Sequence, residues 1–224
     1  PSTCIDNPEN YTDKTLDLNG STIAHAGGVG FIGIQAINRT NITIENGKIT
    51  GFINMGVYLN NCTNATIRNM TVTNINIGEG IHIEHLSSFV NISNLTVESF
   101  TDVGIYIENS FGNEIWDAKL NHNEYGIELV SSQNNSIHDV SGMNNTNLAG
   151  SGAAFYCWHD SGKGYMLPTN NSFERVNGSA NDIGIYSEGC PLTTVMEGEF
   201  WNNTLAGAYF VSSDFTVFGN VTSY

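Results

Sequence analysis

Three glutamates recur at spacings that would place their carboxylates on one surface of a regularly coiling chain. Glu84 and Glu108 are 24 residues apart, Glu128 follows 20 residues later, and His82 and His85 flank the first of them. Two carboxylates about 5 Å apart are the pair that retaining glycosidases use, and each ionised carboxylate raises the pKa of its neighbour. The residues therefore raise the hypothesis of a catalytic site on the three glutamates. A solvated acidic face on an acidic protein is the simpler interpretation, and we favour it from the sequence.

A glycine followed by alternating apolar residues recurs along the chain and would set the positions of these side chains. The successive glycines are Gly33, Gly56, Gly80, Gly104, Gly126, Gly152, Gly184 and Gly207, at intervals of 23, 24, 24, 22, 26, 32 and 23 residues. A period of this length is typical of stacked repeats, because one such unit cannot bury its own apolar face. Residues two and four positions after each glycine should face outward, which assigns Ala154 and Tyr156 to the surface of the sixth unit.

A second apolar register runs between the glycines. Its members are Ile44, Ile67, Ile92, Ile115, Ile137, Phe173, Val195 and Val217. Alternation with period two over a few residues, bounded by Asn, Gly and Ser, indicates short strands, and no segment carries the stripe of an amphipathic helix. Stacking would place like residues over like residues, so the sequence predicts an all-β, single-stranded parallel β-helix of about eight or nine rungs.

The unit from Gly56 to Val72 resembles the repeat of the right-handed parallel β-helix family, which includes NosD-like and pectin-lyase-like solenoids. The resemblance covers residues 16–222 and implies right-handed coiling. We expect one β-helix domain over residues 1–224, with an N-terminal segment at 1–15, rungs at 16–222 and an inserted loop at 156–170. The wider superfamily contains polysaccharide lyases, epimerases, tailspikes and archaeal surface-layer or sheath proteins, so the resemblance alone leaves function open.

The sequence predicts no cofactor and no metal site. Lyases and epimerases of uronates need a cation to neutralise the substrate carboxylate, and the glutamate face offers no Lys or Arg. Calcium needs six to eight oxygen ligands, and no dense aspartate loop is present, so the acidic column gives calcium no support. The methionines and histidines share no repeated ligand spacing of the kind that a copper-related NosD-like protein would need.

Composition excludes some partners and favours an exterior location. The formal net charge is −15, with 7 Lys and Arg against 22 Asp and Glu, so no basic patch is available for nucleic acid. No apolar run of about 18 residues is present, and we expect no transmembrane segment. There are 31 Asn and 15 Asn-x-Ser/Thr triplets, where chance would give about 5.

The triplet excess favours a secreted glycoprotein from a eukaryotic or archaeal exterior, although an Asn-rich repeat would generate triplets without any sugar. Asn69 and Asn94 fall in a column with Asn46 that could form an amide ladder, so we discount them. The glycosylation candidates are Asn10, Asn38, Asn61, Asn64, Asn134, Asn144, Asn170, Asn177 and Asn202.

Four widely spaced cysteines favour disulfides over zinc. Cys157 and Cys190 should lie on consecutive rungs at nearly the same azimuth, so we expect them to be joined. Cys4 and Cys62 either pair with each other or remain apart, with Cys4 free to reach another molecule.

The 32-residue interval after Gly152 predicts a projecting loop that is rich in aromatic residues. Trp158 and Tyr165 could stack on a sugar ring or anchor another subunit, and we favour the protein contact. The sequence-based hypothesis is a glycosylated, self-associating subunit of an extracellular filament, sheath or layer, with no catalytic role. The alternative is a carbohydrate-active or carbohydrate-binding β-helix that uses Glu84, Glu108 and Glu128 or the Trp158 loop.

Overall fold

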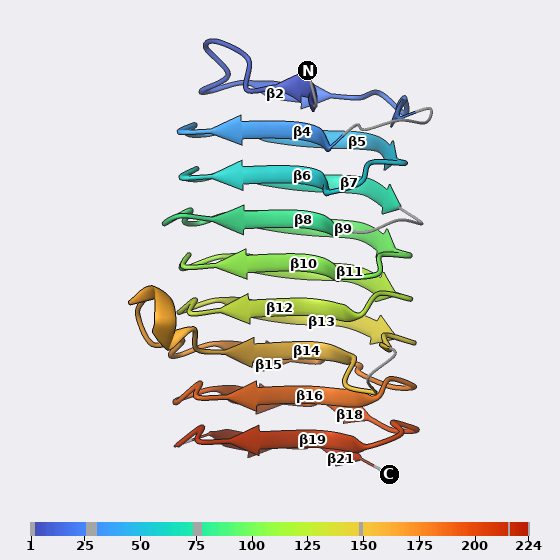
Figure 1. Ribbon diagram of the computed structural model, residues 1–224, viewed down its shortest axis with the longest axis vertical. Coiled ribbons are helices and arrows are strands. Elements are labelled where there is room, and N and C mark those ends of the chain that lie inside the picture. Colours follow the sequence, from blue (N-terminus) through green and yellow to red (C-terminus); the bar gives the residue numbers. More distant parts are fainter. Residues whose placement is uncertain (1–2, 26–30, 74–77, 148–149, 215, 224) are drawn as a thin grey trace.

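The chain winds into a stack of parallel coils, each of which adds one strand to each of two long sheets (Figure 1). The computed structural model describes residues 3–25, 31–73, 78–147, 150–214 and 216–223. Sheet A has nine strands, β1 (Thr3–Asp6), β4 (Ile32–Ile37), β6 (Met55–Asn60), β8 (Glu79–Glu84), β10 (Val103–Glu108), β12 (Tyr125–Val130), β14 (Ala153–Trp158), β16 (Ile183–Glu188) and β19 (Ala206–Val211). The first of these falls within the segment 1–15, so the stack begins earlier than the repeat pattern alone indicates.

Sheet B runs beside sheet A and carries the second register. Its strands are β2 (Thr15–Asp17), β5 (Thr43–Thr50), β7 (Thr66–Thr73), β9 (Asn91–Glu98), β11 (Glu114–Asn121), β13 (Ser136–Met143), β15 (Ser172–Glu174), β17 (Thr194–Met196) and β20 (Val217–Gly219), and β3 (Thr22–Ala24) also pairs with β5. A two-stranded sheet joins β18 (Glu199–Phe200) to β21 (Thr222–Ser223). The all-β parallel solenoid that the repeat predicts is therefore confirmed.

Like side chains stack in the interior because neighbouring coils pair in register. Ile81 pairs with Val57 on one side and Ile105 on the other, and all three are fully buried. Sheet B contributes an equivalent column in which Ile67 pairs with Ile92. The column ends differently from the prediction, because Phe218, not Val217, pairs with Val195. Burial of this kind is worth roughly 1.5–3 kcal/mol for each large apolar side chain, and no single coil could provide it.

The repeated glycine marks the point where the coils approach most closely. A Cβ atom at Gly80 would lie 2.5 Å from the carbonyl oxygen of Gly104 and 2.3 Å from a methyl group of Val97. The sixth coil departs from the predicted alignment, because Ala154 occupies the glycine position opposite Gly126. Its register is therefore shifted by two residues from the alignment that the sequence suggested.

Asparagine columns stabilise the bends between strands. Nδ2 of Asn94 donates to Asn69, and Nδ2 of Asn69 donates to Asn46, which confirms the predicted outer ladder. All three residues adopt positive φ, a conformation that asparagine tolerates better than most residues. Asn61 and Asn64 donate in the same way to Asn38 and Asn41, and Asn170 donates to Asn134. Occupancy of the glycosylation candidates stays a prediction.

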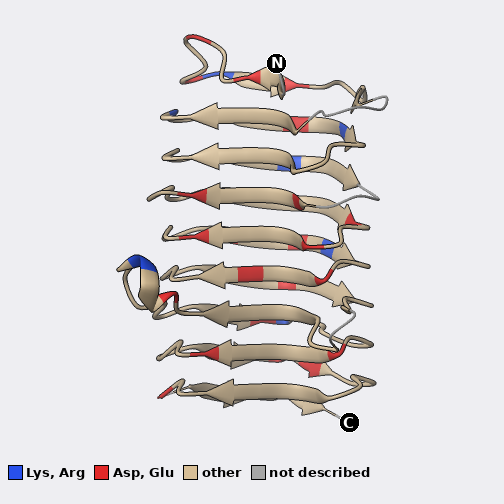
Figure 2. Cartoon of the chain, in the orientation of Figure 1, with Lys and Arg blue, Asp and Glu red and all other residues tan. Residues whose placement is uncertain are grey.

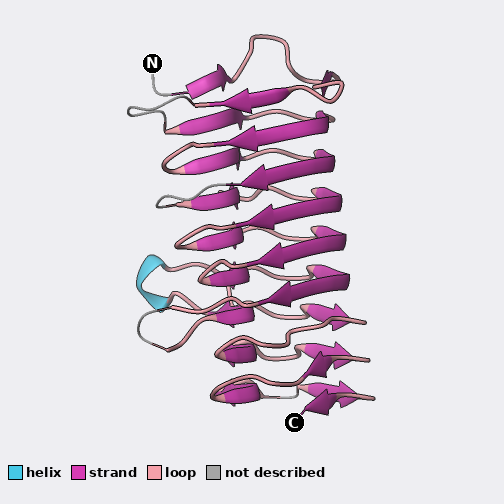
Figure 3. Cartoon of the chain, turned by 90° about the vertical axis from the view of Figure 1, so that its right-hand side faces the viewer, coloured by secondary structure: helices cyan, strands magenta, loops and turns pink. Residues whose placement is uncertain are grey.

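The sixth coil carries the expected insertion, a short helical turn that projects from one side of the stack (Figure 3). The 3₁₀ turn η1 (Ser161–Lys163) begins after Asp160, whose carboxylate accepts a hydrogen bond from the amide of Gly162. Gly164 ends the turn in the left-handed conformation. The loop thereby directs Lys163 back towards sheet A.

The cysteines divide into one bonded pair and two free thiols. Cys157 and Cys190 form a disulfide with a Cα separation of 6.3 Å, which braces the coils on either side of the insertion. Cys4 is exposed and Cys62 is buried, and they are not bonded to each other. Cys4 lies on β1, two strands away from β6 in sheet A, and Cys62 lies six residues beyond the β6 residue aligned with Cys4, so the separation is well above about 10 Å and too great for a disulfide.

We predict that Gly80→Ala destabilises the protein by several kcal/mol, because the added methyl group would collide with backbone that no side-chain rotation can move. Chemical denaturation followed by circular dichroism measures the effect. Gly162→Ala is the matched control, since its Cβ would meet only a flexible Asp160 oxygen at 3.3 Å. Equal stability of the two variants would contradict this account of the glycine column.

Candidate functional site

The outward surface of sheet A carries two columns of functional side chains. The first column contains Tyr58, His82, Tyr106, Glu128, Tyr156, Tyr186 and Tyr209. The second contains Asn60, Glu84, Glu108, Val130, Trp158, Glu188 and Val211. The register shift in the sixth coil makes Tyr156 and Trp158 the outward residues there, whereas the sequence pattern assigned Ala154 and Tyr156. Ala154 is fully buried.

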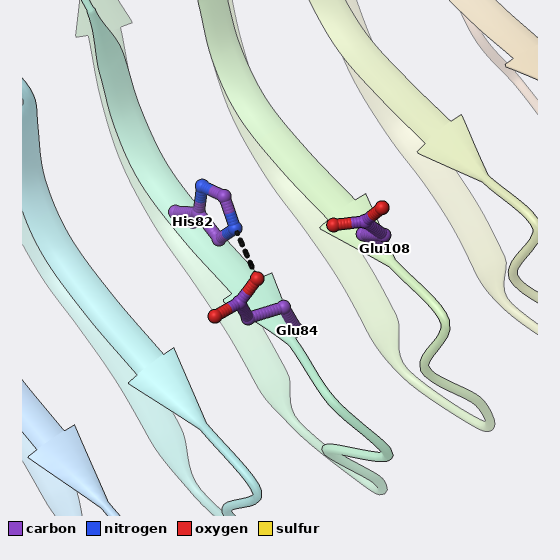
Figure 4. A group of neighbouring side chains, drawn as sticks. All are labelled: His82, Glu84 and Glu108. Atoms are coloured by element: carbon purple, nitrogen blue, oxygen red, sulfur yellow. Dashed lines mark ion pairs between the residues drawn. The ribbon is translucent and has the colours of Figure 1, made fainter. Parts of the chain in front are cut away.

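His82, Glu84 and Glu108 converge where β8 and β10 end (Figure 4). One ligand-type atom from each of the three side chains lies within 4.8 Å of the other two. Nε2 of His82 lies 3.3 Å from Oε2 of Glu84, and Nδ1 of His82 lies 2.6 Å from a carboxylate oxygen of Glu79. In the described part of the chain this is the one group of three side chains with the spacing to hold a metal ion. The sequence pattern had indicated none.

Glu84 is held as a carboxylate and His82 as an imidazolium. Burial acts to raise the pKa of Glu84, but the contact with His82 and its charge, a hydrogen bond from Tyr58 and the Asn60 amide together lower it to about 2. Burial acts to lower the pKa of His82, but Glu79 and Glu84 raise it to about 9. His85 also reaches Glu84, at 2.9 Å, as the sequence suggested.

Glu128 has the opposite environment. The residue is only 8% exposed, and burial, reinforced by the negative charges of Asp102, Glu79 and Glu124, raises its pKa to about 7. The indole nitrogen of Trp158 donates to its carboxylate at 2.6 Å and acts against this rise. Glu128 therefore keeps a proton at neutral pH to an extent that an exposed glutamate would not.

The inserted loop supplies a cation that the sequence analysis missed. Nζ of Lys163 bonds to Glu108, whose side chain is 6% exposed, and lies 5.7 Å from the centre of the Tyr165 ring. The expectation that this face has no Lys or Arg is wrong, because the loop folds back across the end of β10. The repeat pattern does not predict a contact between a loop residue and Glu108, and the only sign of the loop in the sequence was the 32-residue interval.

An aromatic stack extends from Glu128 towards the C-terminal coils. The ring of Tyr156 stacks on Tyr186 with centroids 4.7 Å apart and an interplanar angle of 7°, and it also contacts Tyr125 and Trp158. Tyr186 in turn contacts Tyr209, which is half exposed. Trp158 thus belongs to the sheet surface, while Tyr165 lies on the loop above it.

A polar hollow of about 320 Å³ opens beside the cluster. Its lining includes Asn38, Asn60, Asn61, Asn109 and His85. Asn60 and His85 both contact Glu84, so the hollow adjoins the carboxylate directly. Amide groups that donate and accept hydrogen bonds at an open surface suit a ligand rich in hydroxyl groups.

The predicted glutamates therefore share one face but divide into two settings. Glu84 and Glu108 belong to the second column and meet at their carboxylates, while Glu128 lies in the first column, one coil beyond Glu108. Acidic segments recur along the middle coils of this face, and the blue segment of the projecting loop lies beside them (Figure 2).

A second histidine–carboxylate group lies on sheet B. His138 contacts Glu114 at 3.1 Å and Asp139 at 2.9 Å. Asp139 is also held by Arg175, which neutralises it. This exposed group provides an internal comparison for the buried one on sheet A.

A right-handed beta helix family model matches residues 10–166, well over half of the sequence. The chain belongs to the right-handed β-helix family. No curated protein matches the sequence at a significant level. In the described residues no helix has the length and apolar character to cross a membrane.

Solved structures with the same fold include several that act on polysaccharides. The A-module of the Azotobacter vinelandii mannuronan C-5 epimerase AlgE6 aligns with a TM-score of 0.71 and 13% identity, covering 92% of this chain and 59% of that module. The periplasmic alginate epimerase AlgG aligns with a TM-score of 0.73 and 16% identity, covering 86% of this chain and 47% of the epimerase.

A phage protein is similar along nearly the whole chain. The enzymatically active domain of bacteriophage CBA120 tailspike protein 2 gives a TM-score of 0.54 and 13% identity, covering 99% of this chain and 32% of that protein. The chain thus spans between a third and three fifths of these structures. At such identities the likeness shows a shared fold.

We predict that Glu128→Gln removes a decline in stability with rising pH. The pKa of Glu128 is raised from 4.5 to about 7, so between these values the folded protein keeps a proton that the unfolded chain releases, and stability falls as the pH rises. Between these pH values the free energy of unfolding of the variant should increase relative to that of the wild type by an amount on the order of 3 kcal/mol. Urea denaturation at pH 4.5, 6 and 8 measures it, and parallel curves for the two proteins would refute the prediction.

Proposed function

We propose that this protein binds a polysaccharide along the outward face of sheet A and cleaves it by hydrolysis, with Glu128 as the general acid. The observation that carries the proposal is a buried carboxyl group with a pKa of about 7, hydrogen-bonded to Trp158 and continuous with a stack of tyrosine rings. A carboxylic acid that stays protonated at neutral pH can protonate the leaving oxygen of a glycosidic bond.

The second carboxylate required for hydrolysis is present on the neighbouring coil. Glu108 pairs with Val130, two residues beyond Glu128, so the Cα atoms of the two glutamates are about 8 Å apart. In inverting glycosidases a water molecule lies between two catalytic carboxyl groups that are about 6.5–9.5 Å apart. Glu108 is the residue that we propose to orient that water.

The charge of the face favours a neutral glycan over a polyuronate. Glu79, Glu84 and Glu188 lie on this sheet in addition to the proposed pair, and Lys163 is the one Lys or Arg on the sheet A strands and inserted loop. Its ammonium group is already bonded to Glu108. A chain of uronates would meet like charges along most of the surface.

The solved structures of similar fold support a carbohydrate-active role better than a structural role as a filament subunit, because their names describe alginate epimerases and an enzymatically active tailspike domain. An extracellular or periplasmic location fits the Cys157–Cys190 disulfide. Glycosylation, an archaeal source and self-association stay predictions from the sequence.

Turnover of neutral polysaccharides tests the proposal. Reducing ends are measured after incubation with a panel of neutral glucans, xylans and mannans, and with alginate and polygalacturonate for comparison. Glu128→Gln should lower turnover by about 10²–10⁴-fold, because a general acid contributes that much. The control is Glu174→Gln, a change on sheet B that removes an exposed ion pair with Arg175.

Trp158→Ala should raise KM more than it lowers kcat, because it removes a stacking surface beside the reacting carboxyl. Cleavage of alginate or polygalacturonate together with inertness towards every neutral polymer would overturn the assignment to neutral glycans. Full activity of Glu128→Gln would overturn the role of the acid.

A further inference from the structure

The cluster at the end of β8 has the geometry of a metal site before any ion is bound. Nε2 of His82 and Oε2 of Glu84 are 3.3 Å apart, close to the ~3.4 Å that separates two ligands on a tetrahedral zinc ion. An oxygen of Glu108 lies within 4.8 Å of one ligand-type atom of each of the other two side chains, so the third donor would have to approach by up to about 1.4 Å.

The histidine provides a second and separate indication. Its side chain is only 9% exposed, yet Nε2 has no hydrogen-bond partner, since its contact with Glu84 fails the angular requirement of a hydrogen bond. Nδ1 is occupied by the Glu79 carboxylate at 2.6 Å, which leaves Nε2 as the nitrogen directed at Glu84 and Glu108. A carboxylate behind the histidine is the arrangement that orients metal-bound imidazoles in proteins.

We infer that His82, Glu84 and Glu108 form a binding site for a divalent transition-metal ion, and that Zn²⁺ is the ion the donor set fits. Metal binding releases the Nε2 proton of the His82 imidazolium to solvent. The imidazole nitrogen and two carboxylates then supply three protein ligands, which leaves a fourth position for water or a sugar hydroxyl. Calcium would need six to eight oxygens and has no preference for imidazole, so the same residues disfavour it.

Lys163 already bonds to one of the three ligands. Its ammonium group contacts Glu108, while the lysine side chain as a whole is about half exposed on the inserted loop. An ion that takes Glu108 must displace this contact, so lysine and metal compete for one carboxylate. The exposed loop can release the lysine without opening the core, because no residue of η1 is buried.

Metal binding is tested directly by equilibrium dialysis of the purified protein against Zn²⁺, with metal content measured by atomic emission. The wild type should bind one ion per chain, and Glu84→Gln should weaken binding by at least about 100-fold. Glu79→Gln should weaken it by about 10–100-fold, the usual effect of losing a carboxylate behind a metal-bound histidine. His138→Asn is the matched control, because it removes the histidine of the exposed group on sheet B.

Lys163→Ala is a surface change that leaves the three ligands in place. It should tighten zinc binding by about tenfold, because the competing ammonium is gone, and no general loss of folding could produce that result. Equal weakening by His138→Asn and Glu84→Gln would overturn the site, as would wild-type affinity in both Glu84→Gln and Lys163→Ala. Stronger binding of Ca²⁺ than of Zn²⁺ would overturn the choice of ion. Because the readout is bound metal, the result is independent of whether the protein cleaves any glycan.

Discussion

Hydrogen bonding between parallel strands of successive coils is the constraint on which the rest of this molecule depends. A coil of about 23 residues holds too few apolar side chains to bury them by itself, so it is stable only against its neighbours. In-register pairing then forces each side chain to lie over its counterpart one coil away, as Ile81 lies between Val57 and Ile105. The same pairing assembles the functional face, because Glu84 and Glu108 meet only through this stacking.

Two glutamates on the outward face of sheet A are held in different protonation states by their surroundings. Glu128 sits among other carboxylates and under the Trp158 indole, and it retains its proton near neutral pH. Glu84 is surrounded by His82, Tyr58 and Asn60, all of which donate to it or carry positive charge, and it is ionised. Two carboxyl groups two coils apart are thus set to opposite protonation states by their neighbours. The sequence identified both glutamates as candidates, but the difference between their pKa values arises only from contacts between coils.

The predictable part of the structure is the part that repeats. The glycine positions and the isoleucine columns predicted the solenoid, the shared face of the glutamates and the Cys157–Cys190 disulfide, because all of these follow from the period. The errors arose where the period breaks. Ala154 replaced a glycine and moved Trp158 onto the sheet surface, and the loop brought Lys163 to Glu108. The distance that a loop reaches depends on its own turns, such as the cap at Asp160, and these leave no periodic signal.

The outer amide ladder has a direction that its first member imposes. A carboxylate can only accept hydrogen bonds, and Asp17 accepts one from the side-chain amide of Asn46. The side-chain oxygen of Asn46 then accepts from Asn69, and that of Asn69 accepts from Asn94. The buried column of Asn113, Asn135 and Asn171 donates the opposite way, towards the C-terminal coils. The two chains of amide dipoles therefore oppose each other along the coil axis. A single aspartate in the first coil therefore fixes the donor and acceptor orientation of side-chain amides up to three coils away.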